Sequence, residues 1–153
     1  MRTSADDVNV NDLSDDEYRR LLAFRNALRR FLRWSEERAT ELGVAPAQHQ
    51  LLLAVRGHDN PLGPTIGDVA DSLLLRHHSA VGLVDRAVAA NLVERRPDSE
   101  DQRFVHLRLT PLGARRLRQL AASHLAELRR MPLAMNPLFS LDALDGDGMA
   151  DEG

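Results

Sequence analysis

The chain of 153 residues contains no cysteine, which excludes disulfide bonds and thiolate metal sites. It also lacks any apolar run near the roughly 20 residues that a transmembrane helix needs. The N-terminus, with Asp6 and Asp7 and no apolar core, does not have the pattern of a signal peptide. We therefore expect a single-domain, soluble, cytoplasmic protein.

Signatures of catalysis and of bound metal are missing as well. We find no nucleophile paired with a base, no phosphate-binding loop and no metal-ligand motif. His77 and His78 are adjacent, so on a helix they point about 100° apart, and no third ligand is placed to complete a site. The acidic segment 145–153 resembles a calcium loop but lacks its central glycine and closing glutamate at the required spacing. We expect no enzyme, no cofactor and no metal.

Positive charge is concentrated in the middle of the sequence. The formal net charge is −3, but residues 1–17 carry six acids against one arginine, and residues 131–153 carry five acids and no arginine. The middle holds 19 arginines against 12 acids, a balance of +7. A basic body with acidic ends is compatible with binding phosphate. Within 65–110, however, six arginines face seven acids, so a basic DNA-binding face there depends on side-chain direction.

The segment 65–110 has the pattern of a helix-turn-helix followed by a β-hairpin wing. Thr65 and Asp68 form a capping box for a first short helix. After the apolar connection Leu74-Leu75, apolar residues recur at helical spacing from about His77 to Ala90, and Asn91 tolerates the positive φ of a helix end. This second helix would be the recognition helix.

The hydrophobic period changes from 3.6 to 2 after this helix. Residues 92–95 and 105–109 alternate apolar with polar, and residues 97–102 between them are turn-forming. Two such strands predict a protruding hairpin, with Arg95 and Arg96 on one side of its tip and Arg103 on the other. Thr110 and Pro111 then start another helix.

Long helices are predicted on both sides of this segment. Ser14 and Glu17 form a capping box for a helix that can run to Gly43, and a shorter helix follows from Pro46 to about Arg56. The first helix is longer than a small domain needs for its own core, which suggests a dimer interface. We expect a disordered arm at 1–13, a winged domain at 14–131 with dimerisation helices at 14–43 and 111–131 and a DNA-binding lobe at 65–110, and an irregular acidic tail at 132–153.

The sequence of the winged segment resembles the multiple-antibiotic-resistance-regulator (MarR) family of winged helix-turn-helix transcription factors. The most specific match is Asp101-Gln102-Arg103 followed by an alternating strand that ends in Leu109-Thr110. Leu83-Val84-Asp85-Arg86 and Leu92-Val93-Glu94-Arg95 add to it. The resemblance implies a mostly α fold with a small β-hairpin wing and long terminal dimerisation helices. Without cysteine, the thiol-based peroxide sensing of some members is excluded.

The resemblance also implies a function and sites. A homodimer would bind double-stranded DNA at a pseudo-palindromic operator, with the recognition helix in the major groove and Arg103 in a minor groove, and a small aromatic or phenolic effector would release a repressor. Asp101 would orient Arg103, while Arg86 is expected to be structural or to position phosphate rather than read bases. The predicted DNA-binding residues are Arg76, His77, His78, Ser79, Arg86, Arg95, Arg96, Asp101 and Arg103. Residues that could line an effector cleft are Phe31, Trp34, Arg38, His49 and His124, of which Phe31 and Trp34 could equally belong to the core or to the dimer interface.

Two departures from the family pattern leave an alternative open. Arg76 is a poor cap where members often have serine, and Gly82 presents no side chain where many have a basic or polar one. Gly82 also costs the helix about 1 kcal/mol relative to alanine. A winged-helix module that contacts only proteins is therefore the alternative to a DNA-binding regulator.

Overall fold

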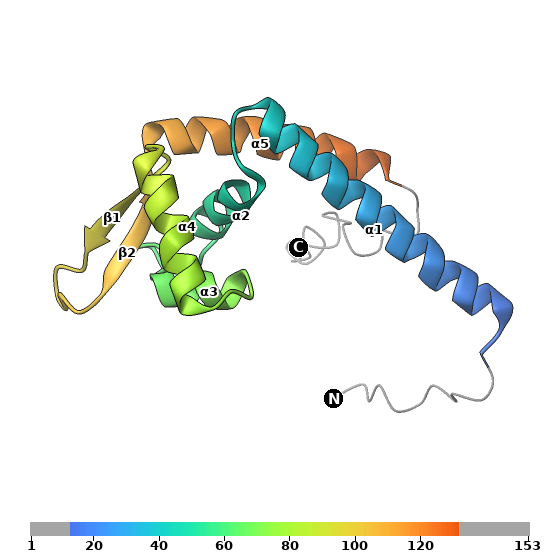
Figure 1. The fold of residues 1–153 in the computed structure, drawn as a ribbon, viewed down its shortest axis with the longest axis horizontal. Helices are drawn as coiled ribbons and strands as arrows, with labels where there is room; N and C mark the ends of the chain where they lie inside the picture. The colour runs from blue at the N-terminus through green and yellow to red at the C-terminus, as the bar shows by residue number, and fades with distance from the viewer. Residues whose placement is uncertain (1–12, 132–153) are drawn as a thin grey trace, which may run out of the picture. The chain divides into compact units, whose positions relative to one another are not determined.

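The computed structural model describes residues 13–131, so the predicted acidic tail and all but one residue of the N-terminal arm lie outside it. The described residues form five helices and one two-stranded sheet (Figure 1). In chain order these are α1 (Asp15–Glu41), α2 (Pro46–Arg56), α3 (Ile66–Ser72), α4 (His77–Ala89), β1 (Val93–Pro97), β2 (Val105–Leu109) and α5 (Pro111–Arg130). The predicted fold class is confirmed. One compact unit runs from Arg33 to Ala126, and the residues before and after it form a second.

Both predicted capping boxes are present. The Thr65 hydroxyl accepts from the backbone N–H of Asp68 at 3.2 Å, and the Asp68 carboxylate accepts from that of Thr65 at 2.9 Å. These bonds satisfy two N–H groups that the start of α3 would otherwise leave unpaired. Ser14 and Glu17 make the same exchange before α1, at 2.7 and 3.3 Å. Each of these two helices therefore starts at a pair of capping side chains that stand three residues apart.

Three helices end at a residue with positive φ. Gly43 (φ 73°) follows α1 and Asn91 (φ 58°) follows α4, where the Leu92 N–H reaches back to the Ala87 carbonyl at 2.9 Å. This is the usual left-handed helix end. The same geometry falls on Leu74 after α3, with φ 54° and 93% of its surface exposed. A leucine in this conformation costs about 1 kcal/mol or more.

The β-hairpin of the wing is antiparallel. Its first strand was predicted at 92–95, and it begins one residue later and ends two residues later. Pro97, predicted in the loop, pairs with Val105 at the end of β1. Asp98 N–H donates to the Phe104 carbonyl at 2.9 Å. Hydrogen-bonded and non-hydrogen-bonded pairs alternate along such a ladder. Asp98 and Phe104 form a hydrogen-bonded pair, so Pro97 and Val105 form a non-hydrogen-bonded one, in which β1 needs no N–H group. The hairpin therefore gains one pair, and its tip comprises residues 98–104.

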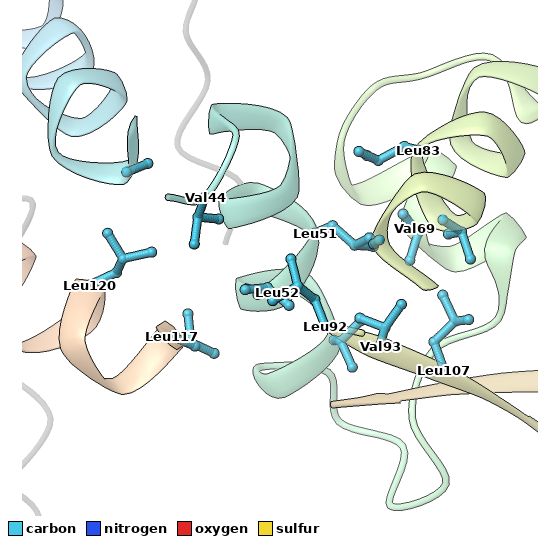
Figure 2. Packing of buried hydrophobic residues seen from close by; sticks show 14 residues of the cluster. Val44, Leu51, Leu52, Val69, Leu83, Leu92, Val93, Leu107, Leu117 and Leu120 are labelled. Carbon is cyan, nitrogen blue, oxygen red and sulfur yellow. The ribbon is translucent and has the colours of Figure 1, made fainter. Parts of the chain in front are cut away.

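The core of the Arg33–Ala126 unit joins the helices to the base of the hairpin. Leu51 and Leu52 of α2 are fully buried, as are Val69 of α3, Val84 of α4 and Leu107 of β2. Figure 2 shows these elements meeting around the labelled leucines and valines. Burying each such side chain contributes about 1.5 to 3 kcal/mol relative to leaving it exposed. The hairpin base and α4 are thus fixed to one scaffold, whereas the hairpin tip projects from it (Figure 1).

The second unit, of which residues 13–32 and 127–131 are described, exposes large apolar side chains. Tyr18, Leu21, Leu22 and Leu32 of α1 are each between 51 and 60% exposed, whereas Ala27 is buried. Adjacent exposed leucines on one helix are typical of a surface that another chain covers. None of the helices within 13–131 is long and apolar enough to cross a membrane.

Candidate nucleic-acid interface

Arg103 stands at the hairpin tip in a fixed arrangement with Asp101. Its Nε donates to Oδ1 of Asp101 at 3.0 Å and its Nη2 donates to Oδ2 at 2.7 Å, while its backbone N–H also reaches Oδ1. The side chain of Arg103 is nevertheless 84% exposed. A guanidinium has five N–H groups, and the two bonds leave three of them without a partner among the described residues. The carboxylate orients the arginine as predicted and leaves its outer edge open.

Each member of this pair stabilises the charged form of the other. The side-chain hydrogen bond from Arg103, followed by the backbone N–H of the same residue, lowers the pKa of Asp101. The same contact raises the pKa of Arg103. Asp101 is therefore ionised at any pH near neutral, and the wing presents one oriented cation.

The loop that carries this pair is organised by Asp98. Its Oδ1 accepts the backbone N–H groups of Glu100 at 2.8 Å and Asp101 at 3.3 Å. The Phe104 N–H then donates to the carbonyl of Asp101 at 3.0 Å. Asp98 thus acts as the side-chain nucleus of the tight turn. In the sequence, residue 98 is only one of the six turn-forming residues 97–102, and nothing local distinguishes it from the others.

The predicted recognition helix exposes its first residues. Arg76 is the N-cap of α4 and makes no side-chain cap hydrogen bond, as predicted from its identity. Arg76, His77 and His78 are exposed, and Ser79 is partly buried. Their side chains and the unpaired N–H groups of the first turn are available to an anionic partner.

Two of the predicted arginines are already engaged by neighbouring carboxylates. Arg95 of β1 forms an ion pair with Asp85 of α4, which connects the recognition helix to the hairpin. Arg96 donates to Glu94 at 2.8 Å on the opposite face of the strand. Both are partly or largely exposed, at 35% and 61%. Their carboxylate partners offset part of the positive charge that the sequence count assigns to the wing.

Arg86 occupies the space that Gly82 leaves on α4. A Cβ built on Gly82 would lie 3.3 Å from Nη1 of Arg86, so the guanidinium lies over the glycine, one turn toward the helix start. Arg86 is exposed and is the only arginine within α4. Many members of the family have a basic or polar side chain where this chain has Gly82. Here the guanidinium of Arg86, one turn later in the helix, lies over that position.

His106 was missed by the sequence analysis. The strand alternation predicts an outward, exposed side chain, but His106 is only 6% exposed. The loop before α3 covers this side chain, because His106 Nδ1 lies 2.8 Å from the Gly63 oxygen. The same loop is held at the free edge of β2, where the Leu107 N–H donates to the Pro64 carbonyl at 2.8 Å. Gly63, with φ 91°, permits this approach, since a Cβ there would lie 2.1 Å from the Leu107 oxygen. Only the glycine-proline pattern at 63–64 hinted at a close backbone contact.

The structure brings together three of the residues predicted to line an effector cleft. The His124 ring lies 4.8 Å from that of Trp34 and 4.7 Å from that of His49, measured between ring centroids. His124 also contacts the Ser35 hydroxyl at 2.6 Å and the Leu120 carbonyl at 2.7 Å. Arg38 instead pairs with Glu41 at 3.0 Å, and Phe31 belongs to the other unit. Within 13–131 no three histidine or acidic side chains group to hold a metal ion.

The buried His49 predicts a dependence of stability on pH. Burial, and then the nearby His124, lower the pKa of His49 from its ordinary 6.5. Below about pH 6.5 the unfolded chain therefore takes up a proton that the folded chain refuses, so the free energy of unfolding falls as pH falls. We expect His49→Gln to reduce this fall between about pH 6.5 and pH 5, measured by urea unfolding at each pH.

The exposed His77 provides the matched control for that measurement. His77→Gln removes an exposed histidine that takes no part in the contact between His49 and His124, and it should leave the slope of stability against pH unchanged. Superimposable slopes for the wild type and His49→Gln would show that burial of His49 is not the source of acid sensitivity.

Comparison with known proteins agrees with the geometry. Residues 42–103 match the model of the MarR family, so the resemblance seen in the sequence is confirmed over this part of the chain. No curated protein sequence matches the chain. Among solved structures, similar ones are AbsC, a MarR family transcriptional regulator from Streptomyces coelicolor (21% identity, TM-score 0.65, 88% of each chain covered), and a MarR family protein from Bacillus stearothermophilus (20%, 0.66, 88% of each).

A third similar structure contains DNA. A point mutant of MepR from Staphylococcus aureus, bound to an oligodeoxyribonucleotide, has 17% identity and a TM-score of 0.59, with 88% of this chain and 96% of that one covered. At these identities the likeness establishes a shared fold, the winged helix of MarR-type regulators.

Proposed function

We propose that this chain, whose residues 42–103 match the MarR family and whose fold is that of MarR-family transcription regulators, is a sequence-specific DNA-binding transcription regulator. The observation that carries the proposal is the exposed Arg103 held by Asp101 at the tip of a hairpin whose base is fixed to the recognition helix. Such a regulator acts on the chromosome, which places it in the cytoplasm.

The recognition helix is the element proposed to enter the major groove. Its exposed start carries Arg76, His77, His78 and Ser79, which can donate to base edges or phosphates. Arg86, lying over Gly82, adds a guanidinium on the exposed side of the same helix. Imidazole and hydroxyl groups both donate and accept hydrogen bonds, so this set suits base edges as well as phosphate.

The wing is proposed to contact the neighbouring minor groove. Narrow minor grooves have enhanced negative potential and attract inserted arginines. Arg103 meets that requirement because its orientation is fixed before binding, which reduces the conformational entropy lost on contact. Arg95 and Arg96 lie closer to the hairpin base and are proposed to contact the backbone.

We propose that two chains form the DNA-binding unit. The exposed Tyr18, Leu21, Leu22 and Leu32 of α1 offer an apolar surface for a second copy. A two-fold dimer would present two recognition helices about 34 Å apart, so its operator should be an inverted repeat with half-sites about ten base pairs apart or a multiple of that.

We further propose that the regulator is a repressor released by a small aromatic or phenolic effector. The cluster of Trp34, His49 and His124 supplies aromatic faces and buried polar nitrogens in one place. Pockets that combine apolar walls with a few polar groups are typical of small-ligand sites.

The alternative is a winged-helix module that contacts only proteins. It is favoured by Leu74, whose 93% exposed side chain stands beside the start of the recognition helix, and by the carboxylates that pair with Arg95 and Arg96. An exposed apolar side chain of this kind suits contact with a protein better than contact with a phosphate backbone.

A DNA titration separates the two functions. The purified protein is titrated with the duplex upstream of its own gene and with a scrambled duplex, each at two salt concentrations. We expect salt-sensitive binding that exceeds the scrambled duplex by about a thousandfold. Equal weak binding to both duplexes would favour the protein-contact function, and release by aromatic or phenolic compounds can be screened on the specific complex.

A further inference from the structure

His106 is a buried histidine whose two ring nitrogens both face oxygen atoms. Nδ1 lies 2.8 Å from the carbonyl oxygen of Gly63, in the loop before α3. Nε2 lies 3.1 Å from Oδ2 of Asp98, at the start of the wing tip. The ring therefore spans the gap between two segments that are far apart in the sequence.

Neither of these oxygens carries a hydrogen to give. A backbone carbonyl only accepts hydrogen bonds. The backbone N–H of Glu100, and then the side chain of His106, hold the pKa of Asp98 below its ordinary 3.8, so its carboxylate is ionised and also only accepts. A neutral imidazole has one N–H group and would satisfy one of the two oxygens. Both contacts are hydrogen bonds only if both nitrogens carry a proton.

The second oxygen of Asp98 continues the connection to the wing arginine. Oδ1 accepts the backbone N–H groups of Glu100 and Asp101, and the Asp101 carboxylate in turn holds Arg103. A continuous series of hydrogen bonds thus runs from Gly63, through His106, Asp98 and Asp101, to Arg103. Such a series fixes the loop conformation in which the arginine is presented.

We propose that His106, carrying a proton on each ring nitrogen, is a positioning residue for the wing, so that the contribution of Arg103 to DNA affinity is linked to pH. The inference rests on the proposed function and adds a regulation to it. Deprotonation of the ring breaks one of its two hydrogen bonds, which releases either the wing tip or the loop before α3. DNA affinity then falls as pH rises.

The surroundings of His106 contain charges of both signs. Asp68 of α3 acts on the same region and is itself 3.8 Å from His58. Arg96 lies opposite His106 in the hairpin register, where Glu94 neutralises it, and Arg108 lies on the same face. α2 also contacts β2, and its Leu51 and Leu52 belong to the same buried apolar cluster as Leu107. Asp98 and Asp68 thus bring negative charge to this region, and Arg108 brings positive charge.

Asp98→Asn is the variant that tests the proton requirement. The amide oxygen of the substituted side chain can still accept from Glu100 and Asp101, while its amide nitrogen can donate to Nε2 of a neutral His106. The neutral ring would then make both of its hydrogen bonds, one as donor and one as acceptor. This variant should keep the wing in place without the second proton.

The experiment measures operator affinity between about pH 5 and pH 8, where histidine changes its charge, at constant ionic strength. We expect the affinity of the wild type to fall by about tenfold more than that of Asp98→Asn over this range, as for the loss of one charged hydrogen bond. The exposed His77 and His78 are present in both proteins, so the comparison isolates the effect of the substitution at Asp98. In the Arg103→Ala background the difference between the two should disappear.

The outcomes separate the inference from the function on which it rests. Specific binding with the same pH dependence in both proteins would overturn the inference and leave the function intact. Absence of specific binding at every pH would instead overturn the function. In that case, or if Asp98→Asn does not fold, the ¹⁵N resonances of the His106 ring near neutral pH decide: two protonated nitrogens support the double donor, and one unprotonated nitrogen contradicts it.

Discussion

Gly113→Ala is expected to lower the free energy of unfolding by about 3 kcal/mol or more. A Cβ at this position would lie 1.9 Å from the carbonyl oxygen of Leu92 and 2.9 Å from its carbonyl carbon. These are backbone atoms, so no rotamer change relieves the contact. Two hydrogen bonds also hold the start of α5 close to the residues before β1. Thr110 donates its hydroxyl to the Asn91 carbonyl at 2.6 Å and its N–H to the Leu92 carbonyl at 3.1 Å.

Gly82→Ala provides a control with the same change of one methyl group. Its Cβ would meet only the end of the flexible Arg86 side chain, at 3.3 Å. In a helix interior this change should stabilise by up to about 1 kcal/mol. Urea unfolding of both variants measures the contrast. A loss below about 1 kcal/mol in Gly113→Ala would mean that the start of α5 can move away from β1.

Arg103→Ala is expected to weaken operator binding by about 1 to 3 kcal/mol, or roughly five- to 150-fold in affinity. The substitution removes the one hairpin-tip cation whose direction is fixed, and it leaves Asp101 as an unpaired carboxylate facing the DNA. Since Arg103 is 84% exposed, the stability of the protein and its oligomeric state should not change. Fluorescence anisotropy with labelled operator measures the loss.

Arg19→Ala is the matched control for this charge change. It also removes an exposed arginine from an ion pair with a neighbouring carboxylate, Asp16 at 2.7 Å, but on α1. We expect it to leave operator affinity nearly unchanged. Equal losses in the two variants would mean that net charge, and not the wing, determines binding.

Local sequence signals predicted most of the fold. The Thr65 capping box, the helix end at Asn91 and the restart at Thr110-Pro111 depend on side chains within a few residues of the backbone groups that they satisfy. The change of period after Asn91 placed both strands to within two residues. The same locality let Asp101 be assigned to Arg103, because the two stand two residues apart.

The misses involve contacts between distant segments. His106 occupies a polar position of an alternating strand, and its burial depends on a loop 43 residues earlier in the chain. The pairing of Arg95 with Asp85 likewise requires the recognition helix and the first strand to meet at a particular angle. Gly113 reads as an ordinary helix-start residue, and only the position of the Leu92 carbonyl shows why a side chain is excluded. Periodicity fixes which face a residue occupies, but not what covers that face.

The bond from the Leu107 N–H to the Pro64 carbonyl has a consequence for solubility. A two-stranded sheet leaves an outer edge on each strand, and the apolar Val105–Leu109 strand with a free edge would be a template for strand addition between molecules. Here the loop before α3 occupies part of that edge. On the other strand, arginines and Pro97 discourage pairing. Both edges of the wing are therefore protected against aggregation when the protein is concentrated.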